Sequence, residues 1–91
     1  MGKNTGVICS QDDRTLPIYQ AARLLNWDIP DDIGIIGYFN TPWVDTFFPS
    51  LTSVSIKEKE IAKKTSEIII KNEEKEIIIK PELVVRDSTR R

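Results

Sequence analysis

Two short apolar runs, each followed by a group of polar residues, constrain the fold of this chain more than any other feature. Residues 5–9 and 33–38 have the length and β-branched content of buried strands, and a helical stretch lies between them. A strand–helix–strand unit of this kind is typical of a parallel α/β sheet. Open α/β sheets bind ligands beyond the carboxyl ends of their strands, so the polar residues after the two runs mark the place of a small polar ligand.

The length and composition indicate one small domain that needs further sequence or a partner to complete its hydrophobic core. The chain has 91 residues, of which 40% are hydrophobic, slightly few for a self-contained α/β domain of this size. Its 13 basic and 14 acidic residues give a net charge of -1. Nucleic-acid-binding modules carry a basic excess, so we do not expect this chain to bind DNA by itself.

Cysteine usage and hydropathy fit a protein of the reducing cytoplasm. Cys9 is the single cysteine, so no intrachain disulfide can form, and its place in an apolar strand predicts packing as a small hydrophobe. The first residues hold too short an apolar run for a signal peptide, and no run reaches the length of a membrane helix. We therefore expect a cytoplasmic protein without a membrane partner.

The rest of the sequence predicts two helices and a third strand. Ser10 is expected to cap a helix that ends near Asn26, and residues 51–56 form the third strand. Ser55 and Glu58 have the spacing of a capping box, ahead of a helix with one apolar and one charged face. The mixed signs of the charged face predict solvent exposure rather than DNA binding.

Two further β-branched runs lie near the C-terminus. Residues 76–79 and 83–86 are predicted to form strands, separated by Pro81. The polar tail of residues 87–91 is expected to fray.

The residue inventory excludes most catalytic chemistry. Histidine is absent, which removes the commonest general base and metal ligand. The sequence has no cysteine cluster for zinc and no glycine-rich phosphate or dinucleotide loop. The acidic pairs Asp12-Asp13 and Asp31-Asp32 do not converge, because adjacent side chains point in different directions. We therefore predict no enzyme activity, no metal and no cofactor.

Three residues near the strand ends are candidates for binding a ligand. The Asp12 carboxylate either accepts hydrogen bonds from vicinal sugar hydroxyls or only complements the helix dipole. Trp43 either stacks on the apolar face of a pyranose or packs in the core. Asn40 either binds the ligand or closes a turn. The residues alone leave these alternatives open.

Several short motifs follow one another in a fixed order along the chain. They are Ser10-Gln11-Asp12, Ile29-Pro30-Asp31-Asp32, Gly37-Tyr38-Phe39-Asn40, Pro49-Ser50-Leu51-Thr52-Ser53-Val54 and Glu82-Leu83-Val84-Val85-Arg86-Asp87-Ser88-Thr89. In order and spacing, the chain from Thr5 to Thr89 resembles the C-terminal part of the lactose-repressor (LacI/GalR) family of bacterial transcription regulators. The family pattern at these places is Ala-Asn-Asp, Val-Pro-Glu-Asp, Gly-Phe-Asp-Asp, Pro-Pro-Leu-Thr-Thr-Val and Glu-Leu-Val-Val-Arg-Glu-Ser-Thr.

The resemblance implies a three-layer α/β fold with a parallel sheet, the type I periplasmic-binding-protein-like fold, of which residues 1–91 form a C-terminal fragment. It implies that residues 5–50 are a strand–helix–strand unit of the C-terminal lobe. Residues 51–80 would cross to the N-terminal lobe and supply a helix there, and residues 81–91 would return. The family's Asp at the position of Asp12 contacts the effector, which implies the same role here.

Departures from the family pattern point to an unusual effector. Gln11 replaces Asn, Phe39-Asn40 replaces Asp-Asp, and Asn26 replaces a helix-ending Gly. An aromatic ring and an amide where the family has carboxylates would change the polarity of the cleft.

The resemblance also implies that much of such a regulator is absent from these 91 residues. DNA contact is expected only through an absent N-terminal domain. Apolar faces that normally meet the absent strands predict self-association, as a homodimer or with exchanged elements.

These observations together predict an effector-sensing fragment of a bacterial sugar-responsive transcription regulator. We expect a repressor whose DNA affinity changes when a small molecule shifts its lobes. The alternative is a fragment of a sugar-binding protein of a transport system, which shares the fold. A third hypothesis, a subunit of an α/β enzyme, has no support in the residue inventory.

Overall fold

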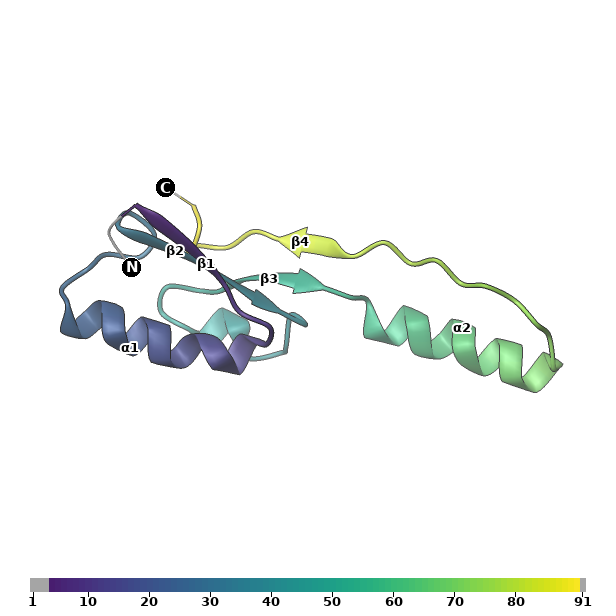
Figure 1. The fold of residues 1–91 in the computed structure, drawn as a ribbon. Helices are drawn as coiled ribbons and strands as arrows, with labels where there is room; N and C mark the ends of the chain where they lie inside the picture. Colours follow the sequence, from purple (N-terminus) through teal and green to yellow (C-terminus); the bar gives the residue numbers. More distant parts are fainter. Residues whose placement is uncertain (1–3, 91) are drawn as a thin grey trace.

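The computed structural model describes residues 4–90, which form an α/β fold with one four-stranded mixed sheet and two α-helices (Figure 1). In chain order the elements are β1 (Thr5–Ile8), the 3-10 helix η1 (Asp12–Thr15), α1 (Leu16–Leu24), β2 (Ile33–Tyr38), the 3-10 helix η2 (Val44–Thr46), β3 (Thr52–Ser55), α2 (Glu58–Lys71) and β4 (Glu82–Val84).

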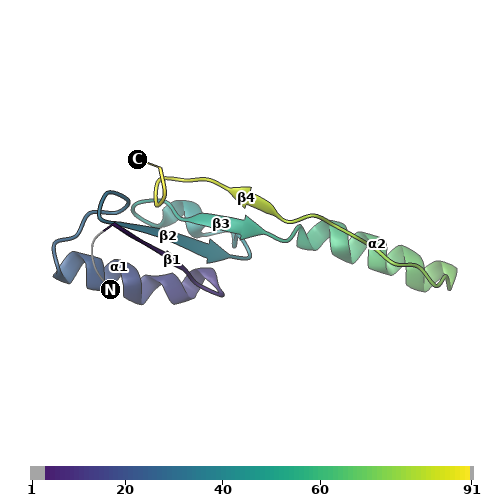
Figure 2. The same cartoon turned by 45° about the horizontal axis from the view of Figure 1, so that its top comes forward.

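The sheet has the strand order β1-β2-β3-β4. The first three strands are parallel, whereas β4 runs antiparallel to β3. Helix α1 lies along one face of the sheet in both views (Figures 1 and 2). The predicted strand–helix–strand unit and the predicted α/β fold class are therefore confirmed.

The core lies where alternate residues of β2 meet α1 and the segment before β3. It consists of Ala22, Ile33, Ile35, Val44 and Leu51, all buried. Because Ile33 and Ile35 are two positions apart, both point to the same face of the strand. The other face carries Ile8, whose side chain is 74% exposed. One face of the sheet is thus covered and the other is open at β1.

Helix α2 and the segment that follows it extend away from the rest of the molecule (Figures 1 and 2). We call residues 57–81 the arm. The radius of gyration is 16.7 Å and the longest dimension is 55 Å, against a radius of about 12 Å for a compact chain of this length. None of the residues of α2 is buried. The apolar face of α2 therefore lacks a cover within the described chain.

The polar tail is fixed to the sheet, so the prediction that it frays is wrong up to Thr89. The Ser88 hydroxyl donates a 2.6 Å hydrogen bond to the carbonyl of Ile35 and accepts one of 2.8 Å from the Thr52 amide. The guanidinium of Arg86 donates to the Leu51 carbonyl and to the Asp45 carboxylate, both at 2.8 Å. Arg91 lies outside the described residues.

Both predicted N-terminal helix caps are wrong. The residue before η1 is Gln11 rather than Ser10, and it makes no side-chain capping hydrogen bond. Lys57 precedes α2 in a left-handed conformation, also without a side-chain cap. The Ser55 hydroxyl instead accepts a 3.3 Å hydrogen bond from the Lys57 amide. The sharp turn from β3 into α2 at Lys57 replaces the capping box.

The predicted helix end at Asn26 and the predicted strand at residues 76–79 have different outcomes. Asn26 has φ 56, the left-handed conformation expected of a residue that ends a helix. Residues 76–79 form no strand, because the arm offers no neighbouring strand to pair with. The last strand is β4, which finds its partner in β3.

Candidate functional site

The carboxyl ends of the parallel strands meet at a crevice. One hollow, with a volume of about 260 Å³, is lined by Gln11, Asp12, Asp13, Phe39, Thr41, Trp43 and Glu58. A second, of about 510 Å³, is lined by Phe39, Asn40, Thr41, Pro42, Ser55, Lys57, Glu58, Lys59 and Glu60. The two hollows share Phe39, Thr41 and Glu58, and we call them together the strand-end crevice.

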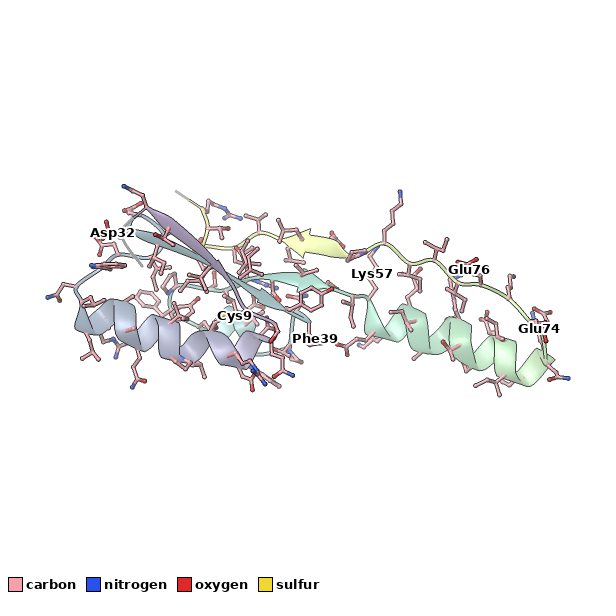
Figure 3. The ribbon with its side chains drawn as sticks, in the orientation of Figure 1. Cys9, Asp32, Phe39, Lys57, Glu74 and Glu76 are labelled. Carbon is pink, nitrogen blue, oxygen red and sulfur yellow. The ribbon has the colours of Figure 1, made fainter. Side chains whose placement is uncertain are left out.

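The crevice lies between the sheet and the start of the arm. Figure 3 shows Cys9 and Phe39 at one end of the sheet, near Lys57, and Asp32 at the opposite end. This is the edge at which open α/β sheets bind ligands. The sequence prediction placed the candidate site at the same edge.

Asp12 is buried and its carboxylate is held by protein donors. Only 1% of the residue is exposed. Oδ2 accepts hydrogen bonds from the amide and the hydroxyl of Thr41 at 2.7 and 2.8 Å, and Oδ1 accepts one from the Ser53 hydroxyl at 2.6 Å. The Asn40 amide in turn donates to the Ser53 hydroxyl at 2.9 Å. A carboxylate offers about four lone-pair positions, so these bonds leave little room for a ligand.

The network needs a glycine in β2. A Cβ atom on Gly37 would clash with Oδ1 of Asp12 and lie 2.8 Å from a methyl carbon of Leu51. The missing side chain gives the Asp12 carboxylate the space to reach past β2 toward Ser53 of β3. The Asp12 network therefore requires glycine at position 37.

The turn after β2 has an unusual backbone. Phe39 has φ 93 and Asn40 has φ 51, both in the region that non-glycine residues rarely adopt. Oδ1 of Asn40 is buried and has no hydrogen-bond partner among the described residues. Strained backbone and unsatisfied buried polar atoms are both concentrated at functional sites. Asn40 thus carries an unused acceptor beside the crevice.

Trp43 lies on the rim of the crevice. Its side chain is 52% exposed, and it lines the smaller hollow together with Phe39. A half-exposed indole offers an apolar face to a ligand, whereas a core tryptophan would be covered. The alternative of Trp43 as simple core packing is therefore disfavoured.

Comparison with known proteins gives the family. Residues 2–89 match the family of periplasmic binding protein-like domains. The chain belongs to this family. The match covers almost the whole chain, which agrees with the extent of the motif resemblance.

The relatives of this periplasmic-binding-protein-like chain are transcriptional regulators. It is 32% identical over 93 residues to the HTH-type transcriptional repressor PurR of Vibrio vulnificus (strain CMCP6), covering 96% of this chain and 28% of that protein. The structure is similar to the periplasmic binding ribose operon repressor protein from Lactobacillus acidophilus, with a TM-score of 0.84, 24% identity, and coverage of 93% of this chain and 34% of that chain. It is also similar to a LacI family transcriptional regulator from Enterococcus faecium with bound ribose, with a TM-score of 0.75, 27% identity and the same coverages of 93% and 34%.

The predicted resemblance to the lactose-repressor family is confirmed by these relatives. The chain spans 28% of the curated relative it matches and about a third of the solved chains. The chain therefore corresponds to about a third of the fold seen in these relatives.

Sequence reasoning missed the parts that Thr41, Ser53 and Glu58 play in the site of this periplasmic-binding-protein-like chain. Thr41 and Ser53 hold Asp12, and Glu58 lines the crevice together with Phe39, whose ring was expected to change the polarity of the cleft. Their signal was weak because serine and threonine are common in loops and strands. Only the pairing of β2 with β3 brings Ser53 next to the end of β1.

Two other groups have perturbed acidity but no catalytic arrangement. Burial raises the pKa of the Cys9 thiol above its usual value, which disfavours the nucleophilic thiolate form. Burial also raises the pKa of the Tyr19 hydroxyl to about 12, and that hydroxyl donates a 2.8 Å hydrogen bond to the Pro49 carbonyl. Tyr19 packs against the hydrophobic core.

Residues 4–90 contain no cluster of His, Cys, Asp or Glu able to hold a metal ion. In this range no helix combines the length and the apolar character needed to cross a bilayer.

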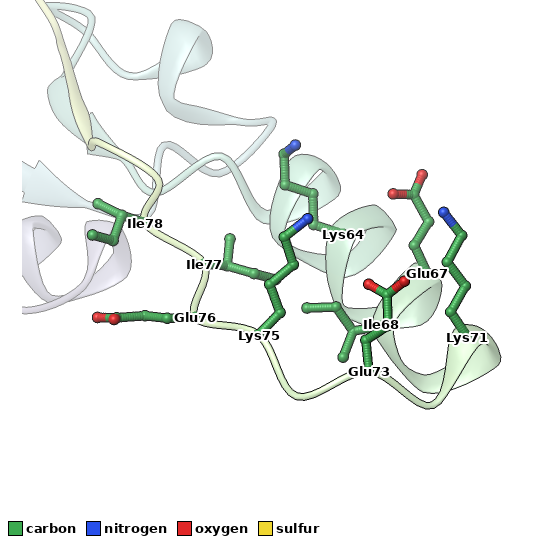
Figure 4. Close-up of a pocket in the computed structure, with 9 residues that line it drawn as sticks. All are labelled: Lys64, Glu67, Ile68, Lys71, Glu73, Lys75, Glu76, Ile77 and Ile78. Atoms are coloured by element: carbon green, nitrogen blue, oxygen red, sulfur yellow. The ribbon is translucent and has the colours of Figure 1, made fainter.

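A third hollow, of about 220 Å³, lies on the arm (Figure 4). It is bounded by α2 and the segment after it, and its charges alternate in sign: Lys64, Lys71 and Lys75 stand against Glu67, Glu73 and Glu76. It is far along the chain from the strand ends and uses only groups of the arm. We assign it no ligand.

Proposed function

We propose that this chain forms one wall of the effector site in a sugar-responsive bacterial transcription regulator, a repressor whose DNA affinity changes on effector binding. The observation that carries the proposal is the crevice at the carboxyl ends of β1 and β2, where Asn40 has a free buried acceptor and Trp43 an exposed ring. The membership of the periplasmic-binding-protein-like family supports it.

The lobe assignment follows from the path of the chain. We infer that residues 5–50 belong to the C-terminal lobe, that residues 51–80 cross to the N-terminal lobe, and that residues 81–91 return. In support, the chain leaves the body after β3, forms α2, and comes back as β4 beside β3 (Figure 2). Two adjacent antiparallel crossings of this kind suit a hinge between lobes. The uncovered face of α2 would then pack on the N-terminal lobe.

The residues of the proposed site divide the work of binding. Trp43 would stack on an apolar ring face of the effector, and Oδ1 of Asn40 would accept a hydrogen bond from it. Asp12 would hold the Thr41 turn in place and offer its last lone pair to a ligand hydroxyl. The relative from Enterococcus faecium with bound ribose makes a sugar the first class of effector to test.

The other partners are proposed from the same reading. With a net charge of -1, residues 1–91 would leave DNA contact to a separate N-terminal domain. We place the regulator in the cytoplasm and expect it to work as a homodimer without enzyme activity. The relatives named as transcriptional regulators support this reading over a transport protein. Reading the coding sequence upstream tests it, because a helix-turn-helix indicates a regulator and a signal peptide indicates transport.

The direct test is a thermal-shift screen of the full-length protein with sugars. A sugar that binds the folded state raises the melting temperature. We expect Trp43→Ala to abolish that shift and Phe48→Ala to leave it intact, since Phe48 is a 93% exposed ring of the same loop that does not line the crevice. Equal shifts in both variants would remove Trp43 from the site. No shift with any sugar would refute a sugar effector.

A further inference from the structure

The charges of the strand-end crevice restrict the effector more than the fold does. The smaller hollow is lined by three carboxylates, those of Asp12, Asp13 and Glu58, and by no basic side chain. Asp13 and Glu58 are exposed to solvent, and within residues 4–90 neither makes an ion pair that would neutralise its charge.

The larger hollow does not offset the negative charge of the smaller one. Lys57 and Lys59 line it together with Glu58 and Glu60, so its charges cancel. Arg14 contacts Gln11, a residue of the smaller hollow. Its guanidinium donates a 3.2 Å hydrogen bond to the side-chain carbonyl of Gln11 and does not line either hollow. The crevice as a whole therefore repels anions.

The hydrogen-bonding groups of the crevice also favour acceptors over donors. The carboxylates of Asp13 and Glu58 and the unpartnered Oδ1 of Asn40 are all acceptors. The carbonyl of Gln11 is already used by Arg14, which leaves the Gln11 amide group and the indole N–H of Trp43 as side-chain donors of the smaller hollow. A wall rich in acceptors binds a ligand that presents several O–H or N–H donors.

Two aromatic side chains complete the surface. Phe39 and the half-exposed Trp43 both line the smaller hollow. Ring faces bind the apolar face of a sugar, and they also attract cations. They give a phosphoryl group no favourable contact.

We propose that this site takes an uncharged or cationic polyhydroxy compound, such as a free sugar or an amino sugar, and rejects phosphorylated sugars. The inference rests on the proposed function, because it concerns the same crevice. A phosphoryl group brought to the smaller hollow would meet three carboxylates and no basic side chain of its lining to stabilise it.

The test compares matched pairs of ligands on the full-length protein. Ribose, glucose, galactose and fructose are each titrated beside their phosphate esters by calorimetry and thermal shift. We expect one free sugar to bind at least about tenfold more tightly than its ester. Raising the salt concentration should narrow that ratio, because exposed carboxylates are screened. Tighter binding of an ester would overturn the inference and leave a sugar-responsive regulator standing, whereas no binding by either member of any pair would overturn both.

A charge variant tests whether the carboxylates of the smaller hollow cause the preference for a free sugar over its phosphate ester. The double variant Asp13→Asn, Glu58→Gln removes two charges and keeps hydrogen-bonding side chains of the same size. We expect the preference for the free sugar to fall severalfold. The matched control, Asp31→Asn with Glu67→Gln, removes the same charges from the opposite end of the sheet and from the outer part of α2, and should leave the preference unchanged. Equal ratios in the two double variants would mean that the discrimination arises elsewhere.

Discussion

The hydroxyl of Ser53 donates a 2.6 Å hydrogen bond to Oδ1 of Asp12, across 41 positions of sequence and past an intervening strand. Asp12 follows β1 and Ser53 lies in β3, so the bond passes over the end of β2. Gly37 makes this possible, because any side chain there would occupy the path of the carboxylate. One buried carboxylate thus ties together all three parallel strands at the edge where the crevice lies.

Replacing Asp12 by alanine should destabilise the fold by about 3 kcal/mol. The change leaves the buried Ser53 hydroxyl and the partly buried amide and hydroxyl of Thr41 without their acceptor, and an unsatisfied buried donor costs about 1–3 kcal/mol. Urea denaturation measures the loss. Asp13→Ala is the matched control, since Asp13 is an exposed neighbour, and its effect should stay within about 0.5 kcal/mol. Similar midpoints for the two variants would mean that the network contributes no stability.

Gly37→Ala should cost about 1–3 kcal/mol, the range typical of overpacking. The added methyl group would meet both Asp12 and Leu51. Gly6→Ala provides the comparison, because a Cβ on Gly6 has nothing within 4 Å in the neighbouring strand β1. We expect the denaturation midpoint of the Gly6 variant to match the wild type. A harmless Gly37→Ala change would show that the carboxylate can move aside without loss.

The stability should fall at alkaline pH through Tyr19. Burial raises the pKa of its hydroxyl to about 12 in the folded state, against about 10 in an unfolded chain. The folded state therefore holds the proton more tightly. This contribution is fully present below about pH 10 and is lost as the pH rises from about 10 to about 12.

The Tyr19→Phe variant isolates this effect from the deprotonation of lysines. It lacks the titrating hydroxyl and leaves the Pro49 carbonyl unpaired, so it should be about 1 kcal/mol less stable near neutral pH. Above about pH 10 the difference from the wild type should shrink. Parallel stability curves for the two proteins between about pH 9 and about pH 11 would contradict the assignment.

The strands and the edge at which they place the site were predictable from the sequence because they rest on local pattern. Residues 33–38 are apolar at every position but the two glycines, and the polar groups that follow them mark the strand end. The contacts of Asp12 were beyond such reasoning, since its partners Thr41 and Ser53 lie 29 and 41 residues away. The sequence allowed a sugar ligand or the helix dipole for this carboxylate. The fold adds a third role, as the anchor of the turn that carries Asn40.

The errors in the sequence prediction share a physical cause. Ser55 could have capped α2, but the left-handed turn at Lys57 moves it out of place. Residues 76–79 have the composition of a strand and lack a neighbour to pair with. The tail is polar and yet fixed up to Thr89, because the Ser88 hydroxyl bonds backbone atoms of β2 and β3 and the neighbouring Arg86 guanidinium bonds the Leu51 carbonyl just before β3. In the last two cases a long-range contact, or its absence, overrides the local preference, whereas at Ser55 the backbone conformation of Lys57 does.

Helix α2 should exchange its amide hydrogens rapidly in the isolated 91-residue chain at low concentration. A helix of 14 residues is marginally stable in water on its own, and α2 buries none of its residues, with Ile69 and Ile70 being 72% and 83% exposed. Self-association of the chain would cover these side chains, so the protection of α2 should rise with concentration. Hydrogen exchange followed by mass spectrometry measures it, and the amides of β2 serve as the internal control, since β2 is paired on both sides within one chain. Strong protection of α2 that does not change on dilution would mean that the arm folds back on its own body in solution, and the open arm and the proposed lobe crossing would both be wrong.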